Sequence, residues 1–452
     1  MDGTGAGEGD QTEERARAPE QALRPRALLA RLLGPASAYW AGNALTAGLG
    51  FLLLPLLTRY LSPADYGAVA MFTLVTAVAD PLLGLNLAAA VTRRYYSLPP
   101  EGLARYVGTC LSLLLGTTLL GLLGGLLLEG PLTRLTLLPL GWVLVALSIG
   151  PINAVFGTAA GLLQARERPW AHLLLTTFRA CAGAGLAVWL VVGLELGWQG
   201  RAGSALGSAL LALPAALLVL AMSRAVRPGW DPAHARHALA YGLPLVPHVL
   251  SGVAMSVTDR LFLVHMVDLS SAGLYAVGFQ VGFLMAMLQD GFNKAWVPWL
   301  FARLGTAGPA DKARLVRLTY LYDLGLIALA LLLSLLLPAL LGLIVPARFD
   351  GAWPFVRWIM LAYAFEGAYK MVANYIFYAE RTHLLAVVST GAALLNVPLT
   401  WAMIRWQGPI GAAQATAMVS LLMWLLTWVL SARCYPMPWW GWRSALRRGQ
   451  GP

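Results

Sequence analysis

Residues 331–344 read LLLSLLLPALLGLI, a continuous apolar run within a longer apolar stretch at 319–343. A helix of about 20 apolar residues crosses the ~30 Å hydrocarbon core of a bilayer. Strands of a membrane barrel would instead alternate polar and apolar residues over segments of about ten residues. The run does not alternate, so it predicts a transmembrane helix, in which every backbone polar group is satisfied within the segment.

Comparable stretches recur along the chain, and the composition agrees with them. Hydrophobic residues make up 58% of the 452 residues and charged residues 12%, against about 45–50% and 25% in soluble domains. A water-soluble fold is therefore excluded. The sequence predicts an all-α polytopic membrane protein with about twelve spans, near 38–58, 67–91, 106–128, 136–163, 170–194, 202–222, 238–264, 272–293, 319–343, 354–378, 383–404 and 409–432.

The positive charges predict the orientation in the membrane. The formal net charge is +11, and cytoplasmic loops of membrane proteins carry an excess of Lys and Arg. With the amino terminus inside, the inner segments hold 23 of the 32 Lys and Arg, the outer segments hold 5 and the spans hold 4. We therefore expect a location in the cytoplasmic membrane with both termini cytosolic, and no nucleic-acid partner.

The spans divide into two sets of six around a polar stretch. The predicted division is a disordered cytosolic arm at 1–37, a lobe at 38–223, a cytosolic linker at 224–237, a lobe at 238–432 and a basic cytosolic tail at 433–452. LSPADYGAVAM at 61–71 aligns with LSSAGLYAVGF at 269–279, with five of eleven positions identical. Because six is an even number, both lobes enter the membrane from the same side. They would form a parallel repeat with a cavity between them.

The sequence offers no catalytic or cofactor signature. It lacks a GxSxG-type nucleophile setting, a GxxxxGK phosphate loop and a His/Cys cluster. Its three cysteines, Cys110, Cys181 and Cys434, lie far apart in the sequence. No predicted loop is long enough to hold a soluble catalytic domain. We therefore expect a protein that is not an enzyme and that uses no metal or other cofactor.

Ionisable residues inside the spans carry most of the functional information. Each costs at least about 2.5–3.5 kcal/mol to insert, so it normally faces the bundle interior, a wet cavity or another charge. Nine such residues stand out: Asp80, Arg179, Asp259, Arg260, Asp290, Asp323, Arg357, Glu366 and Lys370.

Two of these residues lie in the first lobe. Asp80 precedes Pro81, whose missing N–H and ring clash would open the helix. It either binds a coupling proton or sodium ion or accepts hydrogen bonds from a neighbouring helix at the kink. Arg179 has no charged residue three or four positions away. Its partner must come from another helix or from an anionic ligand.

Four more residues form two pairs in the second lobe. Glu366 and Lys370 are four residues apart and share a helix face, so they form either a structural ion pair or a site that opens to an anion. Asp259 and Arg260 are adjacent in sequence and point to different faces of their helix. We expect one of them to line the cavity while the other packs.

The remaining charges lie closer to the ends of the predicted spans. Arg59 and Arg357 are at outer helix ends, where long side chains can reach the lipid headgroups. Asp290 and Asp323 are near inner ends. We expect them to be solvated or paired with Lys294 and nearby arginines.

Four stretches together resemble a known family. They are LLPLLTRYLSPADYGAVAMF at 53–72, YGLPLVPHVLSGVAMSVTDRLFL at 241–263, SSAGLYAVGFQVG at 270–282 and FNKAWVPWLFARL at 292–304. The chain resembles the polysaccharide exporters, or Wzx-type O-antigen flippases, of the multidrug/oligosaccharidyl-lipid/polysaccharide superfamily. The resemblance covers nearly all of residues 36–432.

The resemblance implies a two-lobed transporter working by alternating access. Its substrate would be a polyprenyl-pyrophosphate-linked glycan, moved across the bilayer for lipopolysaccharide or other surface polysaccharide synthesis. A polysaccharide polymerase and chain-length proteins would be its partners. We name as substrate-binding candidates Arg179, Arg260, Arg357 and Lys370. We name as ion-coupling candidates Asp80, Asp259 and Glu366.

Two alternatives stay open at the level of sequence. An ion-coupled multidrug exporter of the same superfamily would be expected to have an acidic, cation-seeking cavity, whereas four basic residues lie within the predicted spans. A membrane-embedded polyprenyl-sugar transferase would need a paired-acid or metal-binding loop, which the sequence lacks.

Overall fold

A computed structural model of the chain describes residues 35–342 and 345–441. The predicted arm at 1–37 and tail at 433–452 lie largely outside these residues. Twelve helices of 20 residues or more occur in the described part: α3 Pro35–Tyr60, α4 Pro63–Gly84, α6 Pro100–Leu127, α8 Leu140–Ala165, α9 Pro169–Val188, α10 Gly197–Met222, α12 Leu245–Met266, α13 Leu269–Leu304, α14 Pro309–Gly342, α15 Trp353–Tyr378, α16 Thr382–Gln407 and α17 Gly411–Cys434.

These helices confirm the predicted all-α polytopic membrane fold. Eight apolar helical segments of the described chain are long enough to cross a membrane, or nine when a bent pair is counted. In that count α16 and α17 form one segment, Thr382–Cys434. Shorter elements join the long helices: α5 Leu87–Tyr95, α7 Glu129–Thr136, α11 Pro232–Gly242 and the helical turns η1 Trp189–Gly193, η2 Ala347–Ala352 and η3 Gly408–Ile410.

The second predicted span is broken, but not at its proline. Helix α4 continues through Pro81 to Gly84, and the Pro81 carbonyl accepts a hydrogen bond from the N–H of Leu85. Leu85 and Asn86 then adopt left-handed backbone conformations before α5 begins. The break therefore comes one turn after Pro81, whereas the missing N–H and the ring of a proline disturb the turn before it.

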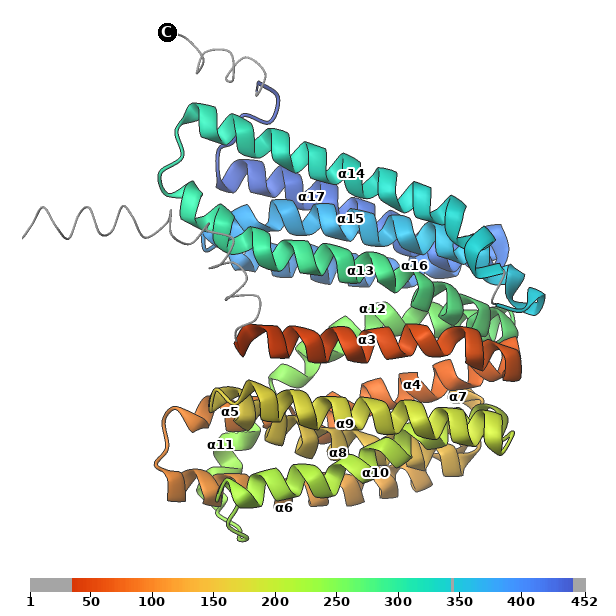
Figure 1. Cartoon of the computed structure of the whole chain (residues 1–452), viewed down its shortest axis with the longest axis vertical. Coiled ribbons are helices and arrows are strands. Elements are labelled where there is room, and N and C mark those ends of the chain that lie inside the picture. The colour runs from red at the N-terminus through yellow and green to blue at the C-terminus, as the bar shows by residue number, and fades with distance from the viewer. Residues whose placement is uncertain (1–34, 343–344, 442–452) are drawn as a thin grey trace, which may run out of the picture.

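The helices form two groups, seen below and above the middle of Figure 1. In the first group α4, α6 and α10 pack on α8, and α9 packs on α10. In the second group α13, α14 and α17 pack on α15, and α16 packs on α17. Helices α3 and α12 lie between the groups, with α3 against α9 and α12 against both α16 and α4.

The two groups meet where α4 and α13 begin, at the right of Figure 1. Glycines make this close approach possible. A Cβ on Gly67 would overlap the backbone of Leu269, and a Cβ on Gly273 would overlap the Pro63 carbonyl. We call this end of the bundle the sealed end. It is built by the two stretches that sequence comparison aligned, 61–71 and 269–279.

Polar bonds between the groups reinforce the sealed end. An Arg348 guanidinium nitrogen donates to the Thr58 carbonyl at 2.7 Å and to the Arg59 carbonyl at 2.6 Å, so it caps the C-terminus of α3. Nε2 of His265 lies 2.8 Å from the Leu135 carbonyl. These contacts join η2 to α3 and the end of α12 to the end of α7.

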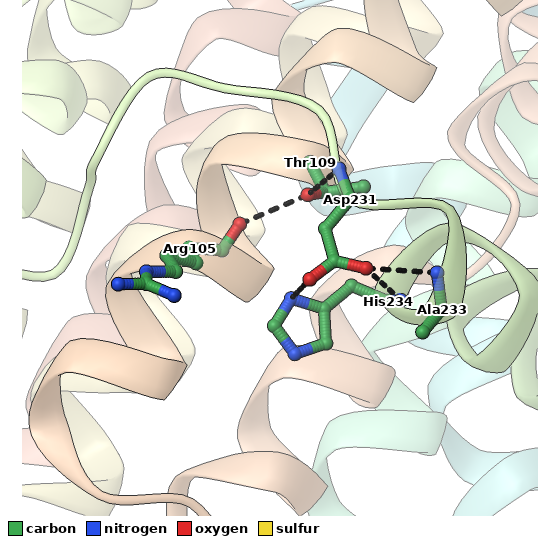
Figure 2. A network of polar contacts seen from close by, with 5 residues as sticks. All are labelled: Arg105, Thr109, Asp231, Ala233 and His234. Carbon is green, nitrogen blue, oxygen red and sulfur yellow. Dashed lines mark hydrogen bonds and ion pairs between the residues drawn. The ribbon is translucent and has the colours of Figure 1, made fainter.

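The opposite end carries the connection between the two groups, and we call it the linker end. The backbone N–H of Arg227 donates to the Ala104 carbonyl at 2.9 Å, and Gly108 leaves room for the linker backbone on α6. Figure 2 shows how the linker enters α11: the N–H of Asp231 donates to Thr109 Oγ1 at 3.3 Å, while its carboxylate caps the helix. The linker is thus held against the first group.

Candidate functional site

A cavity of about 280 Å³ lies between the two groups, next to the sealed end. The first group and α3 contribute one side of its lining, and α12 and α13 contribute the other. Two arginines line it, Arg201 from α10 and Arg260 from α12, and no carboxylate appears among the described lining residues. The other lining residues are Gly50, Leu53, Leu57, Leu61, Tyr66, Val69, Ala70, Thr73, Ala276, Phe279, Gln280 and Phe283.

Arg260 and its neighbour Asp259 point to different surroundings, as their adjacency in the helix requires. The Arg260 guanidinium lies 5.1 Å from the centre of the Phe279 ring, and its buried Nε has no hydrogen-bond partner among the side chains that the structure describes. This arginine keeps a donor for a ligand in the cavity.

Asp259 is enclosed in the second group, with 1% of its surface exposed. Its carboxylate accepts hydrogen bonds from the hydroxyls of Tyr275 at 2.6 Å, Thr416 at 2.6 Å and Thr400 at 3.1 Å. The three donors come from α13, α17 and α16. These hydrogen bonds hold the three helices against α12, so they have a structural role. The predicted ion-coupling role of Asp259 stays a prediction.

Arg201 is the cavity residue that sequence reasoning missed. The sixth predicted span begins at 202, which leaves Arg201 just outside it, in an outer connection. Helix α10 begins at Gly197, so Arg201 lies in its second turn. One guanidinium nitrogen donates to Ser204 Oγ at 3.1 Å. A predicted start of the sixth span at 197 instead of 202 would have placed Arg201 inside the membrane and identified it as a candidate.

Tyr66 and Gln280 are further polar residues of the cavity. The Tyr66 hydroxyl is buried and has no hydrogen-bond partner in the described part of the chain. The Gln280 amide donates to the Gly50 carbonyl at 2.6 Å, which ties α13 to α3 across the cavity. With the unpaired Arg260 Nε, the Tyr66 hydroxyl supplies a second donor group at this end.

In the first group, Asn153 of α8 joins Asp80 of α4 to Arg179 of α9. The Asn153 amide nitrogen donates to the Asp80 carboxylate at 2.8 Å, and its carbonyl accepts from Arg179. The Arg179 guanidinium also lies 4.6 Å from the centre of the Phe156 ring. The helix partner expected for each charge is therefore the same asparagine.

In the second group, Lys370 of α15 holds two carboxylates. Its Nζ lies 2.6 Å from Asp290 of α13 and 2.9 Å from Glu366 one turn earlier in α15. The expected Glu366–Lys370 pair is present, and Asp290 joins it. The expectation that Asp290 would be solvated or paired with Lys294 or arginines did not include this lysine, which lies 80 residues further along the chain.

Helical spacing relates these two charged groups to the cavity. Asp80 comes seven residues after the lining residue Thr73 in α4, and Asp290 comes seven residues after Phe283 in α13. Seven residues are about two turns, so each carboxylate shares a helix face with the lining residues. Each lies about 10 Å from them along its helix, in the direction of the linker end.

Other predicted charges lie elsewhere. Arg357 is exposed and is not among the described residues that line the cavity, so its predicted substrate contact stays a prediction. Asp323 was expected to be solvated or ion-paired, but it is 5% exposed and its Oδ1 has no hydrogen-bond partner. It lies on α14, outside the cavity lining.

Solved structures share this fold. A multidrug resistance MATE family transporter of the MOP superfamily, in an inward-facing conformation, aligns with a TM-score of 0.69 at 14% identity, covering 90% of this chain and 96% of the other. The lipid II flippase MurJ, in an inward closed conformation, aligns with a TM-score of 0.66 at 13% identity, covering 91% and 90%. The predicted superfamily fold is confirmed.

Sequence relatives come from Haemophilus influenzae. The Lsg locus putative protein 1 is 22% identical over 409 residues, covering 85% of this chain and 95% of that protein. An uncharacterized membrane protein is 29% identical over 146 residues, covering 30% and 34%. A family model described as polysaccharide biosynthesis protein matches residues 33–303, more than half of the chain. The chain therefore belongs to the polysaccharide biosynthesis protein family, as a multi-pass membrane protein.

Proposed function

We propose that this protein is a flippase that moves a polyprenyl-pyrophosphate-linked oligosaccharide from the inner to the outer leaflet of the cytoplasmic membrane by alternating access. The observation that carries the proposal is the cavity end lined by Arg201 and Arg260 without a carboxylate. Guanidinium groups suit phosphate oxygens because they donate several hydrogen bonds in a fixed planar arrangement. The family and the flippase among the structural relatives support it.

The substrate is an amphiphile, and the fold suits one. Its charged headgroup needs a polar compartment, while its prenyl tail is most stable in the bilayer. A cavity between two helix groups can hold the first and leave the second outside. With the linker end in the cytoplasm, as the Lys and Arg distribution predicts, headgroups would enter from the inner leaflet and meet the arginines at the far, sealed end.

The charged groups on the path to the cavity have a role in this scheme. Arg179 and Lys370 are each held by neighbours, through Asn153 to Asp80 in one case and by Asp290 and Glu366 in the other. A pyrophosphate can compete for these two cationic side chains. A proton or sodium ion then takes the place of the cationic side chain on the carboxylates. This exchange would couple substrate movement to an ion gradient.

A cation-coupled drug exporter is the second candidate. Exposed carboxylates on Asp290 and Glu366 favour it, since organic cations seek acidic groups. The flippase is favoured because the part of the cavity next to the sealed end is cationic. Cargo must pass this part of the cavity when the transporter changes from its inward-facing to its outward-facing state. A transferase would need a set of catalytic groups that the described cavity lining does not offer.

The test is transport of a labelled polyprenyl-pyrophosphate oligosaccharide in proteoliposomes. Arg201→Gln and Arg260→Gln should each slow delivery to the outer leaflet about tenfold, since a charge-assisted hydrogen bond contributes about 1.5–3 kcal/mol. Arg405→Gln is the matched control, because Arg405 stacks on Trp401 in the last turn of α16, outside the cavity. Equal transport by all three variants would remove the cavity assignment.

A second measurement separates the flippase from the drug exporter. An organic cation dye is added outside inside-out vesicles, on their cytoplasmic face, in place of the lipid-linked substrate. A flippase should leave the dye distribution unchanged with or without an ion gradient. Gradient-driven dye export that survives Arg201→Gln and Arg260→Gln would establish the exporter instead.

A further inference from the structure

A second built site lies on the outside of the second helix group, between α14 and α17. Its floor is Val372 of α15, on which both helices pack. One wall is formed by Tyr320, Asp323, Leu324 and Ile327 of α14, and the other by Trp424, Leu425 and Trp428 of α17. Trp439 closes it at the linker end. We call this pocket of about 240 Å³ the tryptophan groove.

The groove contains a carboxyl group with one oxygen that has no partner among the described residues. Asp323 is 5% exposed, and its buried Oδ1 has no hydrogen-bond partner. Ionised or not, a buried carboxyl group with an unused oxygen costs free energy. Such a group calls for a donor from outside the protein, and a cation is the donor that compensates its charge best.

The aromatic rings around Asp323 suit the same ligand. Trp428 and Trp439 stand at 90° to one another with ring centres 6.0 Å apart, and Tyr320 lies 6.0 Å from Trp439. The Tyr320 hydroxyl donates to the Trp439 carbonyl at 3.0 Å and so fixes this residue at the end of the groove. Aromatic walls bind alkylammonium ions through the negative faces of their rings.

Unused donors sit in the same walls. Within residues 35–342 and 345–441, the buried indole N–H groups of Trp424, Trp428 and Trp439 have no hydrogen-bond partners. They can serve acceptor oxygens placed near a bound cation. The groove therefore offers a carboxylate and ring faces for a positive group, together with N–H groups for oxygens beside it.

The rim of the groove is apolar and exposed, and the predicted span places it near the headgroup level of the bilayer. Leu324 and Leu425, at its rim, are 66% and 40% exposed, as expected of lipid-facing side chains on α14 and α17. Asp323 comes four residues after the predicted start of its span at 319, about 6 Å along the helix. Tryptophans collect at this interfacial depth in membrane proteins.

The geometry points to the tryptophan groove as a binding site for the ammonium headgroup of a membrane phospholipid. The ammonium lies against Asp323 and the faces of Trp428 and Trp439, and the phosphate oxygens accept from the indole N–H groups. A phosphatidylethanolamine-type lipid carries an ammonium group next to a phosphate, and its acyl chains follow the exposed leucines. The site is separate from the cavity between the helix groups.

Native mass spectrometry of the detergent-solubilised full chain tests the proposal. Phosphatidylethanolamine and phosphatidylglycerol with the same acyl chains are added in equal amounts, and bound lipid is counted. The wild type should retain phosphatidylethanolamine about tenfold better than phosphatidylglycerol. This is roughly the effect of one desolvated cation–π contact together with the Asp323 carboxylate. Asp323→Asn and Trp428→Leu should each remove that preference.

Controls make every outcome decisive. Asp311→Asn changes an exposed acid near the start of the same helix, paired with Arg314 at 3.6 Å, and should keep the preference. Thermal melts confirm that all variants are folded. An equal preference in wild type and Asp323→Asn overturns the site, as does preferred retention of phosphatidylglycerol. Retention of tetramethylammonium without phosphatidylethanolamine would assign the groove to soluble cations and overturn the lipid.

Discussion

Asp259 shows how the membrane interior treats a single charged residue. Its carboxylate is buried and accepts three hydroxyl hydrogen bonds from three other helices. Removing the acceptor leaves three buried donors without partners, and each costs about 1–3 kcal/mol. Part of this cost is offset because the carboxyl group no longer has to be buried. Asp259→Ala should therefore destabilise the fold by about 2 kcal/mol. Thermal unfolding in detergent checks this, and Asp311→Ala should melt like the wild type.

Asp80 and Asp290 differ from Asp259 because both lie on the cavity side of their helices and are linked to a cationic side chain. Asp290 contacts Lys370 directly, and Asp80 is linked to Arg179 through Asn153. Asp80→Asn keeps a hydrogen-bonding side chain next to Asn153 and removes the exchangeable charge. It should abolish the dependence of transport on an ion gradient while the protein still inserts and melts normally. Transport assays with and without a pH or sodium gradient test this, and an unchanged gradient dependence would exclude Asp80 as the coupling group.

At the scale of elements, α4 and α13 depend on glycine where they meet. A methyl group at position 273 would overlap the Pro63 carbonyl, so Gly273→Ala should push the sealed end apart. Overpacking costs about 1–3 kcal/mol, enough to raise the open population about tenfold. A cysteine at Leu61, in a background without Cys110, Cys181 and Cys434, should then react faster with an impermeant maleimide. Gly116→Ala, where open space surrounds the glycine, should leave the rate unchanged.

Helix α11 depends on its N-cap residue, Asp231, in a pH-dependent way. Backbone N–H groups of His234 and Ala233 donate to the Asp231 carboxylate and hold its pKa below the usual range. The capping contribution is therefore present above the unfolded pKa of the carboxyl group and is lost as pH falls through the folded pKa (Figure 2). Hydrogen exchange of α11 amides should speed up in acid relative to Asp231→Asn, which caps without titrating. Parallel pH profiles for the two proteins would contradict this.

At the scale of the whole molecule, the sealed end holds the two helix groups in one arrangement. Arg348 contributes by donating to the carbonyls of Thr58 and Arg59. Its removal should weaken the sealed end by about 1 kcal/mol, or about fivefold in population. Spin labels on Leu137 and Trp406, in the cysteine-free background, should report a larger share of long distances in Arg348→Ala. An unchanged distance distribution would show that other contacts determine the sealed state.

The sequence by itself determined the elements of this protein. Apolar stretches of about 20 residues leave the backbone no alternative to helix in a bilayer, so each predicted span corresponds to a long helix. The ends differ, since α13 continues to Leu304, α14 already begins at Pro309 and α4 ends at Gly84. It also located the ionisable residues and the pair Glu366–Lys370, because four residues in a helix fix a shared face.

Only the tertiary structure decided which charges meet. Lys370 finds Asp290 from another helix, Asn153 joins Asp80 to Arg179, and Arg201 joins Arg260 although 59 residues separate them. The Oδ1 atom of Asp323 has no hydrogen-bond partner among the described residues, and Asp323 lines the tryptophan groove. The physical reason is that apolar residues are spread almost evenly around helices that lie in lipid, so the sequence pattern does not show which face of a helix points inward. Helix rotation and neighbours are then fixed by close glycine contacts and by the pairing of buried polar groups, which no local pattern records.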